Sequence, residues 1–147
     1  MLRGVEHELT LRIILEAPPP GIDFGLQEGS GNDYKTVQTQ RSKTSDLTFT
    51  FTVRAKQNVA GEPNFLGPFS QGPTHGRFVY IDIGTYAGQI GTAWSRRLKI
   101  PLSGITWEMV KKASASGRVL ETRVPGTGRD GGPNCATVKP FAGWKVV

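Results

Sequence analysis

The sequence DLTFTFTVR, residues 46–54, decides the fold of this chain. Apolar residues at 47, 49, 51 and 53 alternate strictly with three threonines and Arg54. A period of two, carried by β-branched and aromatic residues, is typical of a strand with one buried face and one wet face. Residues 8–16, ELTLRIILE, repeat the pattern with leucine and isoleucine on one face. These two segments predict half-buried strands in a sheet that faces water on one side.

Further short β-prone segments, separated by glycine and proline, lie on both sides of these two strands. They are residues 22–27, 34–40, 77–83, 94–102, 118–124 and 136–146. Strands at this spacing predict a mainly β fold, either an antiparallel β-sandwich or a partly open barrel. One short α-helix is expected between Thr106, which is suited to cap its start, and Gly117, which is suited to end it.

The length and the cysteine content of the chain indicate the class of protein. A chain of 147 residues fits one domain, so residues 1–147 are predicted to form a single domain. Cys135 is the only cysteine, so the domain contains no intramolecular disulfide. The start, MLRGVEHELT, lacks the basic and apolar segments of a signal peptide, and no apolar stretch approaches the length of a membrane span. We therefore expect a cytoplasmic protein without a transmembrane segment.

The charge is divided unevenly along the chain. Residues 1–75 contain 7 Lys and Arg against 8 Asp and Glu, whereas residues 76–147 contain 11 against 4. A basic second half raises the local concentration of anions, which include metabolites, phosphate, nucleic acid and anionic lipid. The basic residues are scattered and no RNA-binding motif with interleaved aromatic residues is present, so nucleic acid is not the expected partner.

Two glycine-rich connections are predicted as loops, at residues 57–76 and 125–135. The second contains Gly126-x-Gly128-x-x-Gly131, which matches the dinucleotide-binding fingerprint. That fingerprint needs a helix directly after the loop and an acidic residue about 20 residues further on, and neither is available here. Two interpretations stay open: an anion-binding nest of backbone amides that includes Arg129, or a plain turn.

A pair of arginines in the segment 94–102 is the next candidate for binding. Alternation places Arg97 on one face with Lys99, which indicates a solvated edge, and Arg96 on the apolar face. A buried arginine needs a partner because an unpaired buried charge is costly. Asp82 is the candidate within the protein, and a bound anion is the functional alternative.

The remaining candidates are aromatic, histidine and cysteine residues. Tyr86 and Phe69 lie in glycine-rich loops and are predicted to contact a ligand, although aromatic residues more often pack in the core. His7 and His75 are interpreted as surface residues without metal-ligand spacing, so no metal site and no cofactor are expected. Cys135 is the candidate nucleophile should the protein be an enzyme, and no catalytic residue is otherwise identified.

Several segments together are similar to one protein family. They are IDFGLQ (22–27), NFLGPFSQGP (64–73), RFVYIDIGTYAGQ (77–89), SRRLKIPLSGITWE (95–108) and RVPGTGRDGGPNCATVKPF (123–141). They resemble a family of small bacterial proteins, of about 150 residues, that is catalogued only as a domain of unknown function. The resemblance implies no activity, cofactor or site.

These observations predict a non-catalytic binding module for a small anionic ligand or a protein partner. Its ligand-binding residues would be Arg96, Arg97, Arg129, Asp82, Tyr86 and Phe69. The alternatives are binding of nucleic acid or an anionic membrane through the basic second half, and an enzyme that uses Cys135. Strand edges also leave open a homodimer.

Overall fold

The structure, a computed structural model, is mainly β with one short helix, as predicted. It describes residues 3–18, 20–21, 23–30, 33–66, 78–82, 97–102, 104–115, 117–125, 130–131, 136–137 and 141–147. The elements are β1 (Arg3–Glu16), β2 (Asp23–Ser30), β3 (Asp33–Arg41), β4 (Leu47–Gln57), β5 (Pro63–Leu66), β6 (Phe78–Asp82), β7 (Arg97–Pro101), α1 (Trp107–Ala115), β8 (Val119–Pro125), β9 (Asp130–Gly131), β10 (Ala136–Thr137) and β11 (Lys145–Val146).

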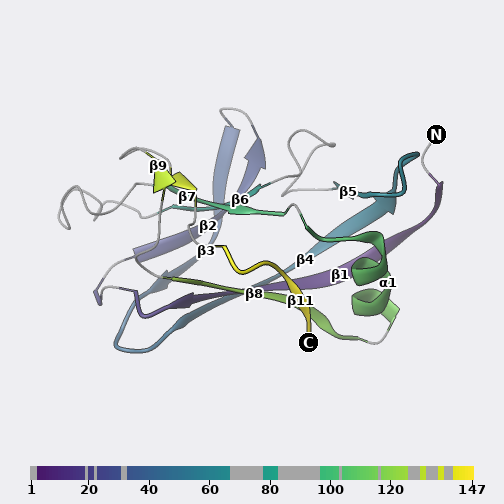
Figure 1. The fold of residues 1–147 in the computed structure, drawn as a ribbon. Helices are drawn as coiled ribbons and strands as arrows, with labels where there is room; N and C mark the ends of the chain where they lie inside the picture. The colour runs from purple at the N-terminus through teal and green to yellow at the C-terminus, as the bar shows by residue number, and fades with distance from the viewer. Residues whose placement is uncertain are drawn as a thin grey trace.

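The strands form two sheets, neither of which is closed. Sheet A has the order β11-β8-β1-β4-β5, and sheet B has the order β3-β2-β6-β7-β10-β9. The two sheets lie as separate layers, and α1 lies at one end of them (Figure 1). One hydrophobic core joins side chains of both sheets, including Leu11 and Phe49 from sheet A and Phe24 and Ile100 from sheet B. Burial of each such side chain contributes about 1.5–3 kcal/mol, so the contact between the sheets is the main stabilising feature.

The alternation predicted for the two longest strands is confirmed. From Leu47 to Ala55, buried residues alternate with exposed residues without a break. In β1, Leu9, Leu11 and Leu15 are buried in the same way. The antiparallel register of β1 and β4 pairs Leu11 with Phe51, so the two apolar faces coincide and pack into one core.

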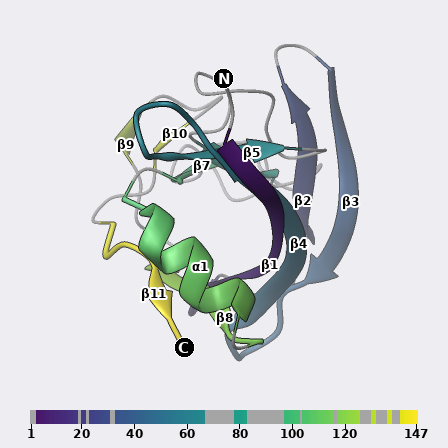
Figure 2. The same ribbon diagram turned by 90° about the vertical axis from the view of Figure 1, so that its right-hand side faces the viewer.

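The helix begins and ends where the sequence predicts. The hydroxyl of Thr106 accepts a hydrogen bond from the backbone N–H of Met109 over 3.2 Å, which satisfies one free donor of the first turn. Gly117 follows the helix with a φ of 64°, a left-handed conformation that glycine adopts without strain. Val110 and Ala113 are buried against the sheets, and α1 lies across β1, β8 and β11 (Figure 2).

Three details of the predicted fold are wrong. The sheets are mixed, because β8 runs parallel to β1 and β10 runs parallel to β7. Parallel strands require a crossover, and α1 carries the chain from sheet B to sheet A before β8 begins. The predicted loop 57–76 contains β5, which pairs with the end of β4. The predicted strand 136–146 is not continuous, because residues 141–144 separate β10 from β11.

Side chains join the two sheets at two seams. At the first seam, Gln38 and Gln40 of β3 donate their amide N–H groups to the carbonyl oxygens of Thr50 and Thr48 of β4, over 2.7 and 2.6 Å. At the second, Trp144 donates its indole N–H to the carbonyl oxygen of Pro101 over 2.7 Å. These bonds connect the sheets where backbone ladder pairing ends.

Candidate functional site

One face of sheet B has polar residues at adjacent positions of neighbouring strands. The longer row of successive Cα partners is, in spatial order, Gln27, Tyr80, Lys99, Thr137 and Asp130. The shorter row beside it is Gly25, Asp82 and Arg97. We call these two rows the polar face. Neighbouring strands lie about 4.8 Å apart, so the rows bring together residues far apart in sequence.

The positions that alternate with the polar face lie on the same side of sheet B as the buried Leu26. The row between the two polar rows is Leu26, Ile81, Leu98, Ala136 and Gly131. Leu26 and Ile100 have no exposed surface, which identifies that side of sheet B as the inner side. Gln27 lies on the opposite side and is nevertheless only 8% exposed. The polar face is therefore covered, at least at β2.

Two of the six residues predicted to bind a ligand occupy the polar face. Asp82 is the last residue of β6 and Arg97 is the first residue of β7, and their Cα atoms are register partners. The register partner of Asp82 is thus Arg97, and the predicted pairing of Asp82 with Arg96 stays a prediction. Arg96 lies outside the described residues.

The other three predicted residues, Phe69, Tyr86 and Arg129, also lie outside the described residues. Each of them lies in a connection that leads to or from a strand of the polar face. Tyr86 belongs to the connection 83–96, which leaves β6 after Asp82 and returns at its register partner Arg97. Arg129 directly precedes Asp130, the last position of the longer row. Phe69 belongs to the connection 67–77, which leads into β6.

The polar face combines hydrogen-bond donors and acceptors with balanced charge. Arg97 and Lys99 provide two cations, and Asp82 and Asp130 provide two carboxylates. Lys99 was not predicted as a site residue, because Arg97 and Lys99 on the same face of one strand indicated only a solvent-exposed edge. The alternation within 77–83 and 94–102 was the available signal, but only strand pairing aligns the two segments.

A second polar cluster joins β1 to α1. The Nδ1 atom of His7 lies 3.0 Å from the hydroxyl oxygen of Ser114, and the ring of His7 meets the ring of Trp107 edge to face at 5.2 Å. The hydroxyl of Ser114 donates its proton to the carbonyl oxygen of Lys111 over 3.3 Å. Which of the two groups donates in the His7–Ser114 hydrogen bond depends on the tautomer of the His7 ring.

This arrangement corrects the interpretation of His7 as a surface residue. His7 is partly buried between the strand and the helix, and its contacts tie the start of β1 to α1. Among the described residues, His7 belongs to no group of side chains that could hold a metal ion.

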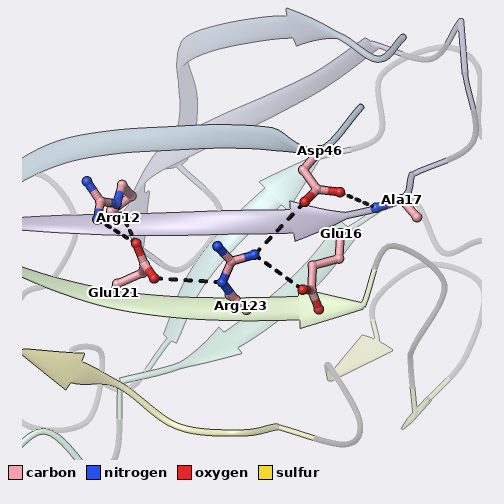
Figure 3. A network of polar contacts seen from close by, with 6 residues as sticks. All are labelled: Arg12, Glu16, Ala17, Asp46, Glu121 and Arg123. Carbon is pink, nitrogen blue, oxygen red and sulfur yellow. Dashed lines mark hydrogen bonds and ion pairs between the residues drawn. The ribbon is translucent and has the colours of Figure 1, made fainter. Parts of the chain in front are cut away.

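The outer side of sheet A contains a network of ion pairs (Figure 3). The Nε and Nη2 atoms of Arg12 both contact Oε2 of Glu121, with Nε at 2.7 Å. Arg123 lies between acidic residues, 3.8 Å from Oε1 of Glu121 and 3.4 Å from Oε2 of Glu16. Asp46 is 4.0 Å from Arg123, and its other oxygen accepts the backbone N–H of Ala17.

The network has more carboxylates than guanidinium groups, so it does not attract anions. Asp46 instead stabilises the end of β1, where Ala17 adopts a φ of 48° that is unfavourable for a residue with a Cβ atom. The sequence analysis did not predict this network, since its members come from β1, β8 and the connection before β4.

Acidic residues also accompany several other described cations. Arg54 pairs with Glu6 at 3.0 Å, Arg41 with Asp23 at 2.8 Å, and Lys111 with Glu108 at 2.8 Å. Hydrogen bonds from Arg41 and from Lys111 hold the pKa values of Asp23 and Glu108 below their usual range. The surface formed by the described residues is therefore not uniformly basic.

Other classes of site find little support within the described ranges. These residues contain no group of three or more His, Cys, Asp or Glu side chains that could hold a metal ion. No helix in the same ranges is long and apolar enough to cross a membrane. Cys135 and His75 lie outside the described residues, so their proposed chemistry stays a prediction from sequence.

Comparison with known proteins gives one match. No curated protein and no solved structure matches the chain. A family of unknown function, DUF5990, matches residues 9–147, which include the helix, the whole polar face and every strand except the first six residues of β1. The chain therefore belongs to the DUF5990 family, whose function is unknown.

Proposed function

We propose that this protein is a non-catalytic binding module for a small anionic ligand, which binds at the polar face of sheet B. The observation that carries the proposal is the register of β2, β6, β7, β10 and β9, which aligns polar residues of five strands in one row. The residue types of the row include hydrogen-bond donors and positive charge, which a ligand with negatively charged oxygen atoms would contact.

Each residue predicted from the sequence has a role in the proposed site. Arg97, with Asp82 as its register partner, would lie at the start of the shorter row. Arg129, next to Asp130, would approach the end of the longer row and provide a second guanidinium group. Arg96, Tyr86 and Phe69 would contribute from the connections that lead to β6 and β7, where ligand-binding residues commonly lie on loops supported by a rigid sheet.

We further propose that residues 1–147 form one cytoplasmic domain, in which the two sheets are the walls of a sandwich or partly open barrel. The shared core and the side-chain hydrogen bonds at both seams support that arrangement. Ligand sites occur preferentially at such scaffolds. Nucleic-acid or membrane binding is not proposed, because many described cations have acidic partners. An enzymatic role at Cys135 is likewise not proposed.

Native mass spectrometry of the purified protein, repeated after denaturation, tests the binding function. We expect a mass excess in the native spectrum that is lost on denaturation and that identifies an anionic compound. The variants Arg97→Gln and Arg129→Gln should each reduce the occupied fraction. Arg118→Gln is the matched control, because Arg118 is exposed and lies just after α1, away from the polar face.

Titration with inorganic phosphate, followed by NMR of the backbone amides, complements the mass spectra. Saturable shifts at residues of β6, β7 and β10 would support the site. An apo mass together with the absence of any saturable shift would exclude it. The native spectrum also reports the oligomeric state, and so tests whether the chain forms a homodimer.

A further inference from the structure

Strand β4 has one long edge that faces away from β1. Within the described ranges, β1 pairs with most of β4 on one side, whereas on the other side β5 pairs only with residues 54–57. The carbonyl oxygens of Thr48 and Thr50 accept hydrogen bonds from β3, so they point away from β1. Both backbone groups of a residue point to the same side of an antiparallel strand, and that side alternates along the strand. Thr48, Thr50 and Thr52 therefore form one open edge, which we call the threonine edge.

Two glutamine side chains of β3 cover the threonine edge. The amides of Gln38 and Gln40 donate to the carbonyl oxygens of Thr50 and Thr48, so β3 runs antiparallel beside β4 (Figure 2). Both bonds are exposed to water, where a hydrogen bond contributes little net free energy. Among the described strands, β3 is the outermost strand of sheet B and has β2 as its one backbone partner. Release of the two amides therefore uncovers the threonine edge without breaking a backbone ladder.

The sequence of the covered strand favours pairing with an identical strand. Residues 47–53, LTFTFTV, have high β-propensity and contain no charge, proline or glycine. Segments of six or seven residues with this composition have a strong tendency to pair with copies of themselves. Natural proteins protect such edges with a charged residue or a proline, or by covering them. Because residues 47–53 contain neither a charge nor a proline, Gln38 and Gln40 provide the protection.

We propose that the threonine edge is a pairing surface for a second copy of this chain, and that the amides of Gln38 and Gln40 keep it closed. The inference goes beyond the binding function proposed above and does not depend on it. An antiparallel pair of two edges with its two-fold axis at Thr50 places Thr50 opposite the same residue of the second copy, and Thr48 opposite Thr52. All three residues direct their backbone groups outward, so each opposed pair can exchange two hydrogen bonds.

The side chains of β4 also suit a second copy. Thr48, Thr50 and Thr52 are exposed, and threonine pairs across an antiparallel ladder are favourable. A two-fold axis brings the same patch of both copies together, so a charged edge would place like charges opposite each other. The threonine edge avoids this repulsion because it is uncharged. An acidic or basic peptide, by contrast, would find no ionic partner in these three residues.

Sedimentation velocity over a range of protein concentrations tests the proposal. The double variant Gln38→Ala, Gln40→Ala should form dimers at concentrations at which the wild type is monomeric. Its association constant should rise at least about tenfold, because two copies together no longer break four exposed hydrogen bonds. Gln57→Ala is the matched control. It removes an exposed amide that donates to the carbonyl oxygen of Gly61 over 3.2 Å, beyond the threonine edge, and should stay monomeric like the wild type.

A charge at the centre of the threonine edge identifies the surface used by the dimer. Thr50→Lys, added to the double variant, places two like charges opposite each other and should restore the monomer. Ala115→Lys adds the same charge at an exposed position at the end of α1 and should leave the dimer intact. Amide spectra show whether each variant is folded. If the double variant does not fold, Gln38→Ala and Gln40→Ala as single variants give the same comparison with a smaller gain.

Three outcomes would overturn the proposal. If the glutamine variants stay as monomeric as Gln57→Ala, the threonine edge does not pair. If the wild type and the double variant dimerise equally well, the glutamines do not close the edge. If Thr50→Lys leaves the dimer intact, the two copies meet through another surface. The phosphate titration that tests the ligand site is independent of all three outcomes.

Discussion

Trp144 donates its indole N–H to the carbonyl oxygen of Pro101, 2.7 Å away, and so links sheet A to sheet B. Trp144 directly precedes β11 of sheet A, and Pro101 is the last residue of β7 in sheet B. The indole is 7% exposed, so the bond lies at the margin of the core. On the other side of the molecule, the amides of Gln38 and Gln40 make the corresponding links.

The bond of Trp144 predicts the effect of a conservative substitution. Trp144→Phe keeps an aromatic ring but leaves the carbonyl of Pro101 without this donor, which should lower the free energy of unfolding by about 1–3 kcal/mol. Urea denaturation measures the change. Trp107→Phe is the control, because the indole N–H of Trp107 makes no hydrogen bond among the described residues. Equal losses in both variants would contradict a specific role for the bond.

The hydrogen bonds of Gln38 and Gln40 should contribute less to the free energy of unfolding than the bond of Trp144, because they are exposed to water. The double variant Gln38→Ala, Gln40→Ala should lower the free energy of unfolding by about 1 kcal/mol, the sum of two weak hydrogen bonds. Faster amide exchange at Thr48 and Thr50 should accompany the loss. Thr39→Ala changes an exposed residue of the same strand and should stay within about 0.5 kcal/mol of the wild type. A double variant as stable as Thr39→Ala would show that the seam is not held by these amides.

Thr122 is a buried hydroxyl with a single defined partner. It is 1% exposed, and its Oγ1 donates to the carbonyl oxygen of Gly143 over 2.8 Å. Thr122→Val preserves the shape of the side chain but leaves the carbonyl of Gly143 without this donor. The free energy of unfolding should therefore fall by about 1–3 kcal/mol. Thr50→Val makes the same chemical change on the wet side of β4 and should have an effect near zero. Calorimetric unfolding of the two variants decides whether burial makes the difference.

Asp23 and Arg41 predict how stability responds to acid. The side-chain hydrogen bond from Arg41 lowers the pKa of Asp23 below its ordinary value of 3.8. The ion pair favours the charged form of Asp23 in the folded state, so it stabilises the protein at pH values above 3.8. This stabilisation is lost as the pH falls through the pKa that Asp23 has in the folded state. The gap in stability between wild type and Asp23→Asn should therefore narrow from pH 7 to pH 3. An NMR titration that places the Asp23 carboxyl at or above its ordinary pKa would refute this.

Much of the secondary structure could be predicted because it depends on local pattern. The alternation in 46–54 produces a buried and an exposed face at any position in a sheet, and β4 has both. Thr106 and Gly117 act on the backbone of their own helix, so the limits of α1 could also be predicted. By contrast, β9, β10 and β11 are two residues long, and each exists through its pairing with another strand.

The candidate site likewise depends on strand pairing. Asp82 and the neighbouring arginines could be named from their segments, whereas the register of Asp82 with Arg97 depends on the pairing of two strands. The pattern of its own segment does not indicate that Lys99 lies in register between Tyr80 and Thr137. The contact of His7 with Ser114 joins residues 107 positions apart, and no local pattern indicates it.

Side-chain periodicity and bonds within a few residues are enough to predict the mainly β class, the two long amphipathic strands and the short capped helix. The parallel pairings, the two seams between the sheets and the rows of the polar face depend instead on contacts between distant segments. Strand register depends on the free energy of packing two distant segments together, and neither segment specifies its partner alone.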